Sequence, residues 1–463
     1  MRNIGIIGSG IIGLLAAHGL RKAGHQVTLY SDKTPEQWLQ VRPTGTAARF
    51  DLSLQLEREL GLNHWDDQVP WAQGAHLLVC PEPRNRLLTL TGRMRRPFQA
   101  VDVRLQSHRW MRDLVERGGR IELESVTVAR LEEISAAHEL TLVAAGRAEL
   151  CRLFERDAAR SVYDAPQRQL TLLCIKGPRM RFDDLPIVPV KFNVFPGAGE
   201  VFYMPYFHKD VGPSWNVLVE AKPGGPLDRF REVRSGEQAV ELAKGLFREL
   251  IPWDADWFRD AELSDPHGWL MGTVTPTVRR PVGRLPSGRE VMGLGDTVTS
   301  LDPIGGQGAN SGSKQVRTLL ECVAEHGDRP FDAAWMSATF ERFYARHGHP
   351  TYTFNNILLE PLTPSARELF MAQYGSDGRE GNRSAVQQLA DAFAENFNDP
   401  ATLTPVFQDS RRMRNFITET TGGAWLSALA RGGLGVARGQ LRQKLGLDPR
   451  HPPRVSAVHD FPR

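Results

Sequence analysis

The chain has 463 residues, of which 41% are hydrophobic and 24% are charged, a balance typical of a globular protein rather than a disordered or fibrous one. Its 57 basic and 54 acidic residues leave a net charge of +3, which lacks the basic surplus expected of a nucleic-acid-binding protein. The four cysteines, Cys80, Cys151, Cys174 and Cys322, are widely spaced, so the sequence predicts neither a disulfide framework nor a metal site. It contains no run of eighteen apolar residues, and we expect a cytoplasmic protein without a membrane span.

The first thirty residues predict a β-α-β unit. Residues 4–7 are typical of a buried strand, and a glycine-rich turn, a helix ending near Gly24 and a second strand over 27–30 follow. In the turn pattern Gly-x-Gly-x-x-Gly, the first glycine allows a tight turn, the second admits a pyrophosphate and the third packs the helix on the strand. The predicted dinucleotide-binding residues are Gly8, Ser9, Gly10, Ile11, Ile12 and Gly13.

The acidic residue that usually binds the ribose at the end of the second strand is missing from its place. Ser31 stands there, and Asp32 comes directly after it. We expect Asp32 or Ser31 to reach the ribose, and an ordinary turn role for Asp32 is an equal alternative. This motif alone does not separate FAD from NAD.

A second glycine-rich region, residues 293–296 followed by 302–310, resembles the flavin-binding motif of FAD-dependent aromatic monooxygenases, which implies that the cofactor is FAD. A strand over 290–293 leads to Gly295 and Asp296, whose carboxylate is suited to accept hydrogen bonds from a ribityl chain. The following loop brings bare backbone against a flavin ring, and a helix starting near its end directs a positive N-terminus at the ring. The predicted loop contacts are Pro303, Gly305, Gly306, Gln307, Gly308, Ala309 and Asn310.

The two motifs lie nearly three hundred residues apart, so one nucleotide domain must be assembled from separated segments. We expect an α/β fold in which a Rossmann-like FAD-binding domain carries an inserted β-sheet substrate domain and C-terminal helices. The predicted ranges are 1–70, 100–160 and 280–330 for the FAD-binding domain, 71–99 and 161–279 for the β-rich substrate domain, 331–430 for a helical region and 431–463 for a basic, loosely ordered tail.

Several segments together resemble the oxygenase component of two-component styrene and indole monooxygenases, over about residues 1–410. These segments are 27–32, 100–105, 293–296, 302–310 and 396–398. The resemblance implies an aromatic-hydroxylase-like flavoprotein monooxygenase that uses reduced FAD and O₂, through a C4a-(hydro)peroxyflavin, to epoxidise or hydroxylate a small apolar aromatic or alkene such as styrene or indole. It also implies that a separate NAD(P)H-dependent flavin reductase supplies the reduced FAD.

The resemblance assigns no catalytic side chain, because the flavin carries out the chemistry. It implies flavin contacts for Arg42, Arg104 and Gly146, and Ala145 stands where single-component relatives carry an aspartate that handles both FAD and NAD(P)H. Gly45 departs from the asparagine that the family typically has at the pocket wall. An apolar pocket is expected between the 303–310 loop and side chains of the β-rich domain, although ordinary core packing is the favoured role for each candidate taken singly. The pocket candidates are Gly45, Trp71, His76, Phe98, Phe192, Tyr203, Ile304 and Phe354.

Other functions remain open from the residues alone. A single-component NAD(P)H-dependent aromatic hydroxylase and a monooxygenase that tailors a natural-product intermediate share these motifs. A flavin-dependent halogenase is disfavoured because residues 251–257 carry the letters of its Trp-x-Trp-x-Ile-Pro signature in the wrong order. A silent flavin-fold escort protein would not need the glycine loop. His347 and His349 lack a third ligand nearby, and the sequence leaves a homodimer open.

Overall fold

A computed structural model describes residues 1–43, 45, 48–146 and 148–447, and it divides the chain into two compact units. The first unit contains residues 1–67, 101–166 and 274–355; the second contains residues 68–100 and 167–273 and continues from 356. The predicted α/β class is confirmed, but the helices after residue 330 do not form one region, since they are divided between the units at Asn355. Among the described residues, no helix combines the length and the apolar character needed to cross a bilayer.

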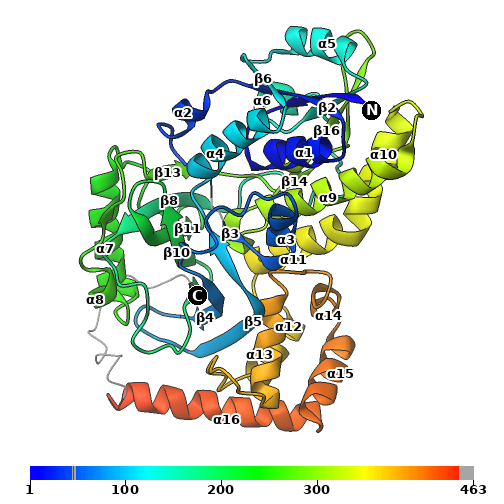
Figure 1. The fold of residues 1–463 in the computed structure, drawn as a ribbon. Helices are drawn as coiled ribbons and strands as arrows, with labels where there is room; N and C mark the ends of the chain where they lie inside the picture. Colours follow the sequence, from blue (N-terminus) through cyan, green and yellow to red (C-terminus); the bar gives the residue numbers. More distant parts are fainter. Residues whose placement is uncertain (44, 46–47, 147, 448–463) are drawn as a thin grey trace. The chain divides into compact units, whose positions relative to one another are not determined.

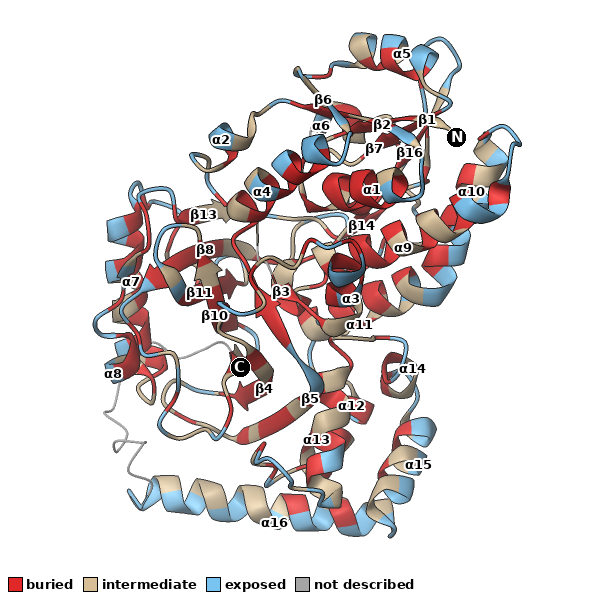
Figure 2. Ribbon diagram, viewed as in Figure 1, coloured by how far each residue is buried: buried red, intermediate tan, exposed pale blue. Residues whose placement is uncertain are grey.

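The first unit is built on a sheet with the order β15-β16-β7-β1-β2-β6 (Figure 1). All neighbouring strands are parallel except β15 and β16. Ile4 pairs with Val27 on one side and Leu140 on the other, and Leu142 pairs with Met292, so three distant segments share this buried sheet (Figure 2). The strands are β1 (Asn3–Ile7), β2 (Gln26–Ser31), β6 (Arg120–Leu123), β7 (Leu140–Val143), β15 (Val282–Arg284) and β16 (Glu290–Gly293).

Helices of the first unit pack on this sheet and on one another. Helix α1 packs against α4 and α9, and Gly19 makes room for Leu320, whose Cδ1 would lie 2.5 Å from an added Cβ. The helices are α1 (Ile11–Lys22), α2 (Pro35–Trp38), α3 (Asp51–Glu59), α4 (Val103–Glu116), α5 (Val128–Ala137), α6 (Ala148–Cys151), α9 (Gly308–His326) and α10 (Ala333–Phe343), with the short 3-10 turns η1 (Gly295–Thr297) and η2 (Pro303–Gly305) and the π-helical turn η3 (Tyr344–Gly348). The remaining short strands are β3 (Ala48–Arg49), β14 (Thr277–Val278) and β17 (Thr299–Ser300), and α11 (His349–Leu359) crosses the boundary between the units.

The second unit contains a mostly antiparallel sheet with the order β12-β8-β11-β10-β9-β4-β5, in which β13 also pairs with β8. Strands β4 and β9 form its parallel pair. The strands are β4 (Ala72–Val79), β5 (Leu88–Ala100), β8 (Gln169–Lys176), β9 (Pro189–Phe195), β10 (Gly199–His208), β11 (Gly212–Ala221), β12 (Glu262–Leu263) and β13 (Trp269–Gly272).

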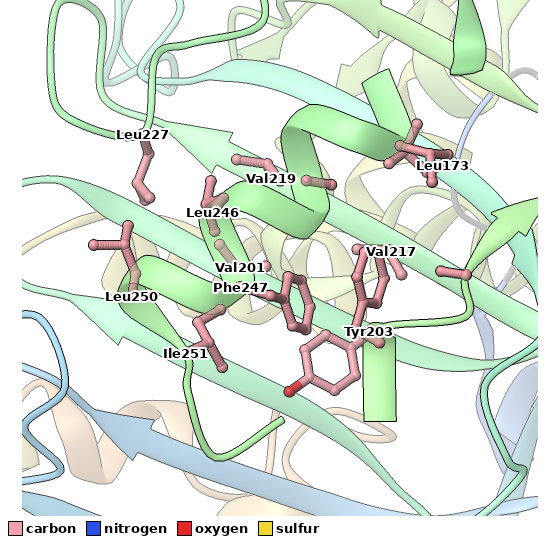
Figure 3. Close-up of a cluster of buried hydrophobic side chains, with 14 of the residues drawn as sticks. Leu173, Val201, Tyr203, Val217, Val219, Leu227, Leu246, Phe247, Leu250 and Ile251 are labelled. Carbon is pink, nitrogen blue, oxygen red and sulfur yellow. The ribbon is translucent and has the colours of Figure 1, made fainter. Parts of the chain in front are cut away.

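Helices α7 (Gly236–Leu250) and α8 (Ala255–Phe258) bury one face of this sheet. Alternate residues of the strands, such as Val201 and Val217, point into a dry core with Leu246 and Phe247 of α7 (Figure 3). The sheet alternation therefore sends the neighbouring residues of each strand to the opposite face.

The C-terminal helices of the second unit correct one prediction. Residues from Arg431 were expected to be loosely ordered, yet α16 continues to Lys444. The glycines that made this segment resemble a loop are used for close packing on α12, because a Cβ at Gly432 would lie 1.8 Å from the Met371 carbonyl oxygen. Residues 448–463 of the predicted tail lie outside the described residues. The helices are α12 (Pro364–Ala372), α13 (Ala385–Glu395), α14 (Thr404–Phe407), α15 (Ser410–Thr421) and α16 (Trp425–Lys444).

Candidate functional site

The three glycines of the first turn have different steric roles. A Cβ at Gly8, where φ is +110°, would lie 2.6 Å from the Ala144 carbonyl oxygen, and a Cβ at Gly13 would lie 1.9 Å from the Gly8 oxygen. A Cβ at Gly10 would meet nothing within 4 Å. Gly8 and Gly13 are therefore needed by the fold itself, whereas Gly10 leaves a space open above the turn.

Two long helices of the first unit begin without a side-chain cap. Gly10, which has no side chain, precedes α1, and Gln307 precedes α9 without capping it. Neither helix has an acidic residue in its first turn. Elsewhere in the described chain, Thr34, Asp102 and Thr127 cap the helices that they precede. An uncapped N-terminus offers free N–H groups and a positive dipole end to an anion.

The two glycine-rich regions meet around Ile12. Its side chain would lie 3.2 Å from a Cβ at Gly295 and 2.5 Å from a Cβ at Gly312 of α9. Only residues without a side chain allow this contact, so motifs separated by nearly three hundred residues form one site in the first unit.

Gln315 holds the Gly-Asp turn in place. Its Oε1 accepts from the Gly295 backbone N–H at 2.8 Å, and its Nε2 donates to the Gly293 carbonyl at 3.2 Å. Asp296 is exposed between buried neighbours. The protein around it still raises the pKa of its carboxyl by desolvation, which Arg279 opposes, so this carboxylate lies in a recess.

The loop before α9 is fixed by its own side chains. Asp302 accepts from the Ile304 N–H at 3.1 Å, and Gln307 Nε2 donates to the Gly305 carbonyl at 2.9 Å. Gly306 has φ of +60°, a left-handed conformation that favours glycine. The loop thus presents backbone in a fixed conformation.

Asn310 ties this loop to the segment that precedes α3. Its Oδ1 accepts from the Phe50 N–H at 2.9 Å and the Ser53 hydroxyl at 2.8 Å, and its Nδ2 donates to the carbonyls of Ala48 and Gly306. Asn310 is fully buried. Its side chain thus holds the loop in place, and its predicted contact with the cofactor stays a prediction.

Ser31 and Asp32 are both engaged within the protein. The hydroxyls of Ser9 and Ser31 lie 2.6 Å apart, and Trp38 Nε1 donates to Ser9 at 3.0 Å. Asp32 accepts from Lys33 Nζ at 2.8 Å near the surface. The predicted ribose contact of either residue stays a prediction.

Arg104 is completely buried at the start of α4, where Asp102 holds its guanidinium. Nε and Nη2 donate to the Asp102 carboxylate, at 2.7 Å for Nη2, and Nη1 donates to the Val41 carbonyl at 3.2 Å. Arg42 and Gly146 are exposed, and a Cβ at Gly146 would meet nothing within 4 Å. Their predicted flavin contacts are untested.

Comparison with known proteins gives matches along most of the chain. Styrene monooxygenase StyA of Pseudomonas fluorescens is 28% identical over 419 residues, which cover 89% of this chain and 96% of that protein. Styrene monooxygenase StyA of a second Pseudomonas is 28% identical over 437 residues, covering 93% and 98%. Residues 146–256 match a family described as "Styrene monooxygenase A putative substrate binding domain", and residues 6–35 match an NAD(P)-binding Rossmann-like domain.

The chain is a flavin-dependent monooxygenase that is similar to styrene monooxygenases. Solved structures share its fold: a flavin-dependent brominase has a TM-score of 0.57 at 15% identity, covering 89% of this chain and 99% of that one. The p-nitrophenol 4-monooxygenase of Pseudomonas putida has a TM-score of 0.55 at 13% identity, covering 91% and 98%. These findings confirm the predicted resemblance to styrene monooxygenases, the dependence on FAD and the monooxygenase class.

The residues of this styrene monooxygenase-like chain fit FAD. The space at Gly10 and the uncapped α1 suit the pyrophosphate, the recessed Asp296 suits a polyol, and the uncapped α9 suits the edge of the ring that is negative when reduced. These matches concern donor and acceptor chemistry in one unit.

The pocket candidates of the styrene monooxygenase-like chain are divided between its units. Ile304 and Phe354 are buried in the first unit, and Gly45, also there, is flanked by residues outside the described ones. In the second unit, His76 Nδ1 lies 2.8 Å from the Thr91 hydroxyl, Phe98 is buried and Trp71 is half-buried.

Tyr203 and Phe192 cannot line one pocket, which corrects the predicted set. Tyr203 lies on the helix-covered face (Figure 3). Its ring stacks on Trp257 with centroids 5.0 Å apart, and its hydroxyl donates to buried Asp254. Phe192 lies on the opposite face and packs against Phe202, its partner in the strand register. The sequence could not show which strand residues α7 and α8 cover.

A histidine and two aspartates of the second unit bring three possible metal-ligand atoms together. Atoms of His208, Asp210 and Asp265 lie within 4.8 Å of one another. His208 Nε2 is 2.6 Å from Asp265, however, and Nδ1 accepts from the Asp210 N–H at 3.1 Å. Both ring nitrogens are already used, so this cluster is a structural clamp.

Sequence reasoning missed Gln315 and Trp38. Each supports a predicted glycine or serine from outside its motif, and neither has a spacing that marks it. Asp102 was overlooked similarly, although its place two residues before Arg104 is a local signal for a helix cap and an ion pair.

Proposed function

We propose that this chain is the oxygenase of a two-component system, which receives reduced FAD from a separate NAD(P)H-dependent flavin reductase and oxygenates a small apolar aromatic or alkene such as styrene or indole. The match to styrene monooxygenases along nearly the whole of both proteins carries the proposal. Bound reduced FAD supplies the activated oxygen from O₂.

The protein's own contribution is binding and charge stabilisation in the first unit. The N–H groups at the start of α1 would hold the pyrophosphate, and Asp296 would accept from a ribityl hydroxyl. The positive N-terminus of α9 stabilises the negative charge of the reduced ring. The glycines between Pro303 and Gly308 would let the ring approach the backbone closely.

The need for a reductase is supported by Ala145. Its carbonyl accepts from the Thr297 hydroxyl at 3.2 Å, next to the Gly-Asp turn, and its methyl side chain offers no group to handle a nicotinamide cofactor. The same position carries an aspartate in the single-component relatives that the sequence resembles.

The test combines purified protein with indole, FAD and NADH, with and without an unrelated flavin reductase. We expect indigo or another oxygenated product only with the reductase, and less product from the Gly10→Val variant when FAD is limiting. Rapid NADH oxidation by the protein alone would overturn the proposal in favour of a single-component hydroxylase. The elution volume of the same preparation tests the homodimer.

A further inference from the structure

One face of helix α16 is packed against other parts of the second unit. Ala428 and Gly432 are buried, and a Cβ at Gly432 would lie 1.8 Å from the Met371 carbonyl oxygen of α12. A Cβ at Gly435 would lie 2.4 Å from the Tyr374 ring. This glycine-rich face lets α16 pack closely and fixes which side of the helix points outward.

The opposite face of α16 is apolar and exposed (Figure 2). Leu426, Leu434, Leu441 and Leu445 are 61%, 62%, 56% and 62% exposed. The spacing of four, four, three, four and four residues places the whole set within an arc of about 100°, centred opposite the glycines. This leucine stripe consists of Leu426, Ala430, Leu434, Ala437, Leu441 and Leu445.

The stripe is unusual for the surface of this protein. A single exposed leucine needs no explanation. Here ten large apolar side chains of the described residues are exposed, and four of the ten belong to one stripe. It extends over about 28 Å of helix, at 1.5 Å per residue. A row of this length marks an interaction surface.

The positive charge of α16 indicates an anionic partner. The helix has four basic residues, Arg431, Arg438, Arg442 and Lys444, all exposed, and no acidic residue. The three arginines follow one flank of the stripe. A second copy would set arginines against arginines without a compensating carboxylate, and the stripe lacks the aromatic anchors typical of protein interfaces. A straight leucine row with a basic flank fits an anionic lipid surface.

We propose that α16 docks the protein on the surface of an anionic lipid bilayer, with the leucine stripe at the acyl boundary and the arginines at lipid phosphates. The helix lies in the plane of the interface and does not cross it. This inference goes beyond the proposed oxygenation and does not depend on it. Docking would place an oxygenase of apolar compounds where such compounds dissolve.

The test is co-sedimentation of the full-length protein with vesicles. We expect binding to phosphatidylcholine vesicles that contain phosphatidylglycerol, at least ~10-fold weaker binding to phosphatidylcholine alone, and weakening by salt. Leu434→Glu/Leu441→Glu is expected to reduce binding by at least ~10-fold, as is the milder Leu434→Ala/Leu441→Ala if the first variant does not fold. Val115→Glu/Leu123→Glu is the matched control, since these residues are 55% and 57% exposed in the first unit, and it should bind normally.

Several results would overturn the proposal. The proposal fails if the protein sediments with neither vesicle, or if the control and the stripe variants lose binding equally. A change of oligomeric mass in the stripe variants, or loss of binding to a purified flavin reductase with vesicle binding intact, would assign the stripe to a protein partner instead.

Discussion

Gly10 offers the sharpest test of the first turn, because the protein can accept a side chain there and a pyrophosphate cannot. Its φ of −74° and ψ of 177° suit any residue, and an added Cβ meets nothing within 4 Å. The Gly10→Val variant should therefore change the free energy of unfolding of the cofactor-free protein by less than about 1 kcal/mol.

The cost should appear on FAD binding. A valine in the open space displaces the pyrophosphate from the N–H groups of α1, and losing one hydrogen bond to a charged group costs about 1.5–3 kcal/mol. That range corresponds to a rise in Kd of about 10- to 100-fold. Calorimetric titration of oxidised FAD, and of reduced FAD in the absence of O₂, into the cofactor-free protein measures the Kd. Urea unfolding measures the stability.

Gly13→Ala is the matched comparison within the same turn. Its Cβ would lie 1.9 Å from the Gly8 carbonyl oxygen, so the backbone must shift, at a cost of about 1–3 kcal/mol or more in stability before any cofactor is added. The steric assignment is refuted if Gly10→Val binds FAD with the wild-type Kd, or if Gly10→Val and Gly13→Ala destabilise the cofactor-free protein equally.

Four further changes probe the first unit. Asp296→Asn should weaken FAD binding by about 10-fold without loss of stability, because it removes a polyol acceptor and a desolvated charge together; unchanged titration would contradict its role. Gly305→Val should abolish FAD binding by contact with the ring, and normal binding by this variant would show that the loop lies elsewhere. Burial lowers the pKa of His18 to about 4, so the unfolded chain gains a proton that the folded chain does not as the pH falls from 6.5 towards 4. Urea titrations should show about 3 kcal/mol of stability lost over that range, and His18→Gln should remove this dependence. Arg49 and Glu57 form a buried pair at 3.2 Å; either single change to Leu should cost about 3–5 kcal/mol and the double change less than either, whereas additive costs would exclude coupling.

The glycine motifs could be predicted from the sequence because their roles are local or nearly so. Gly8 and Gly306 have positive φ, and the turn of 8–13 joins a strand to a helix within a few residues. Residue type and spacing are enough to specify such a turn. The strand over 290–293 follows from its short apolar run in the same way.

The supports of the site could not be predicted because they depend on tertiary contacts. Gln315 reaches Gly295 from two turns inside α9, and Asn310 reaches Phe50 across 260 residues of sequence. The faces of the second sheet are equally hidden, since strand residues alternate between two buried faces and only α7 and α8 decide which face holds Tyr203. The order of α16 was missed because its glycines are helix breakers in isolation and packing residues against α12.

The assembly of the first sheet from distant segments also sets the timing of folding during synthesis. Strand β1 is made at once, but β16, which pairs with β7 beside it, is about 285 residues further on. At about 5–20 residues per second, the ribosome needs roughly 15–60 s to deliver it. For the second half of that interval, after β7 has been made, β7 has an open edge, and throughout it Ile12 lacks the glycines that it will later touch. An unfinished parallel sheet with exposed apolar strands is prone to aggregate. Lower growth temperatures or added chaperones should therefore raise the yield of folded protein without changing its final stability.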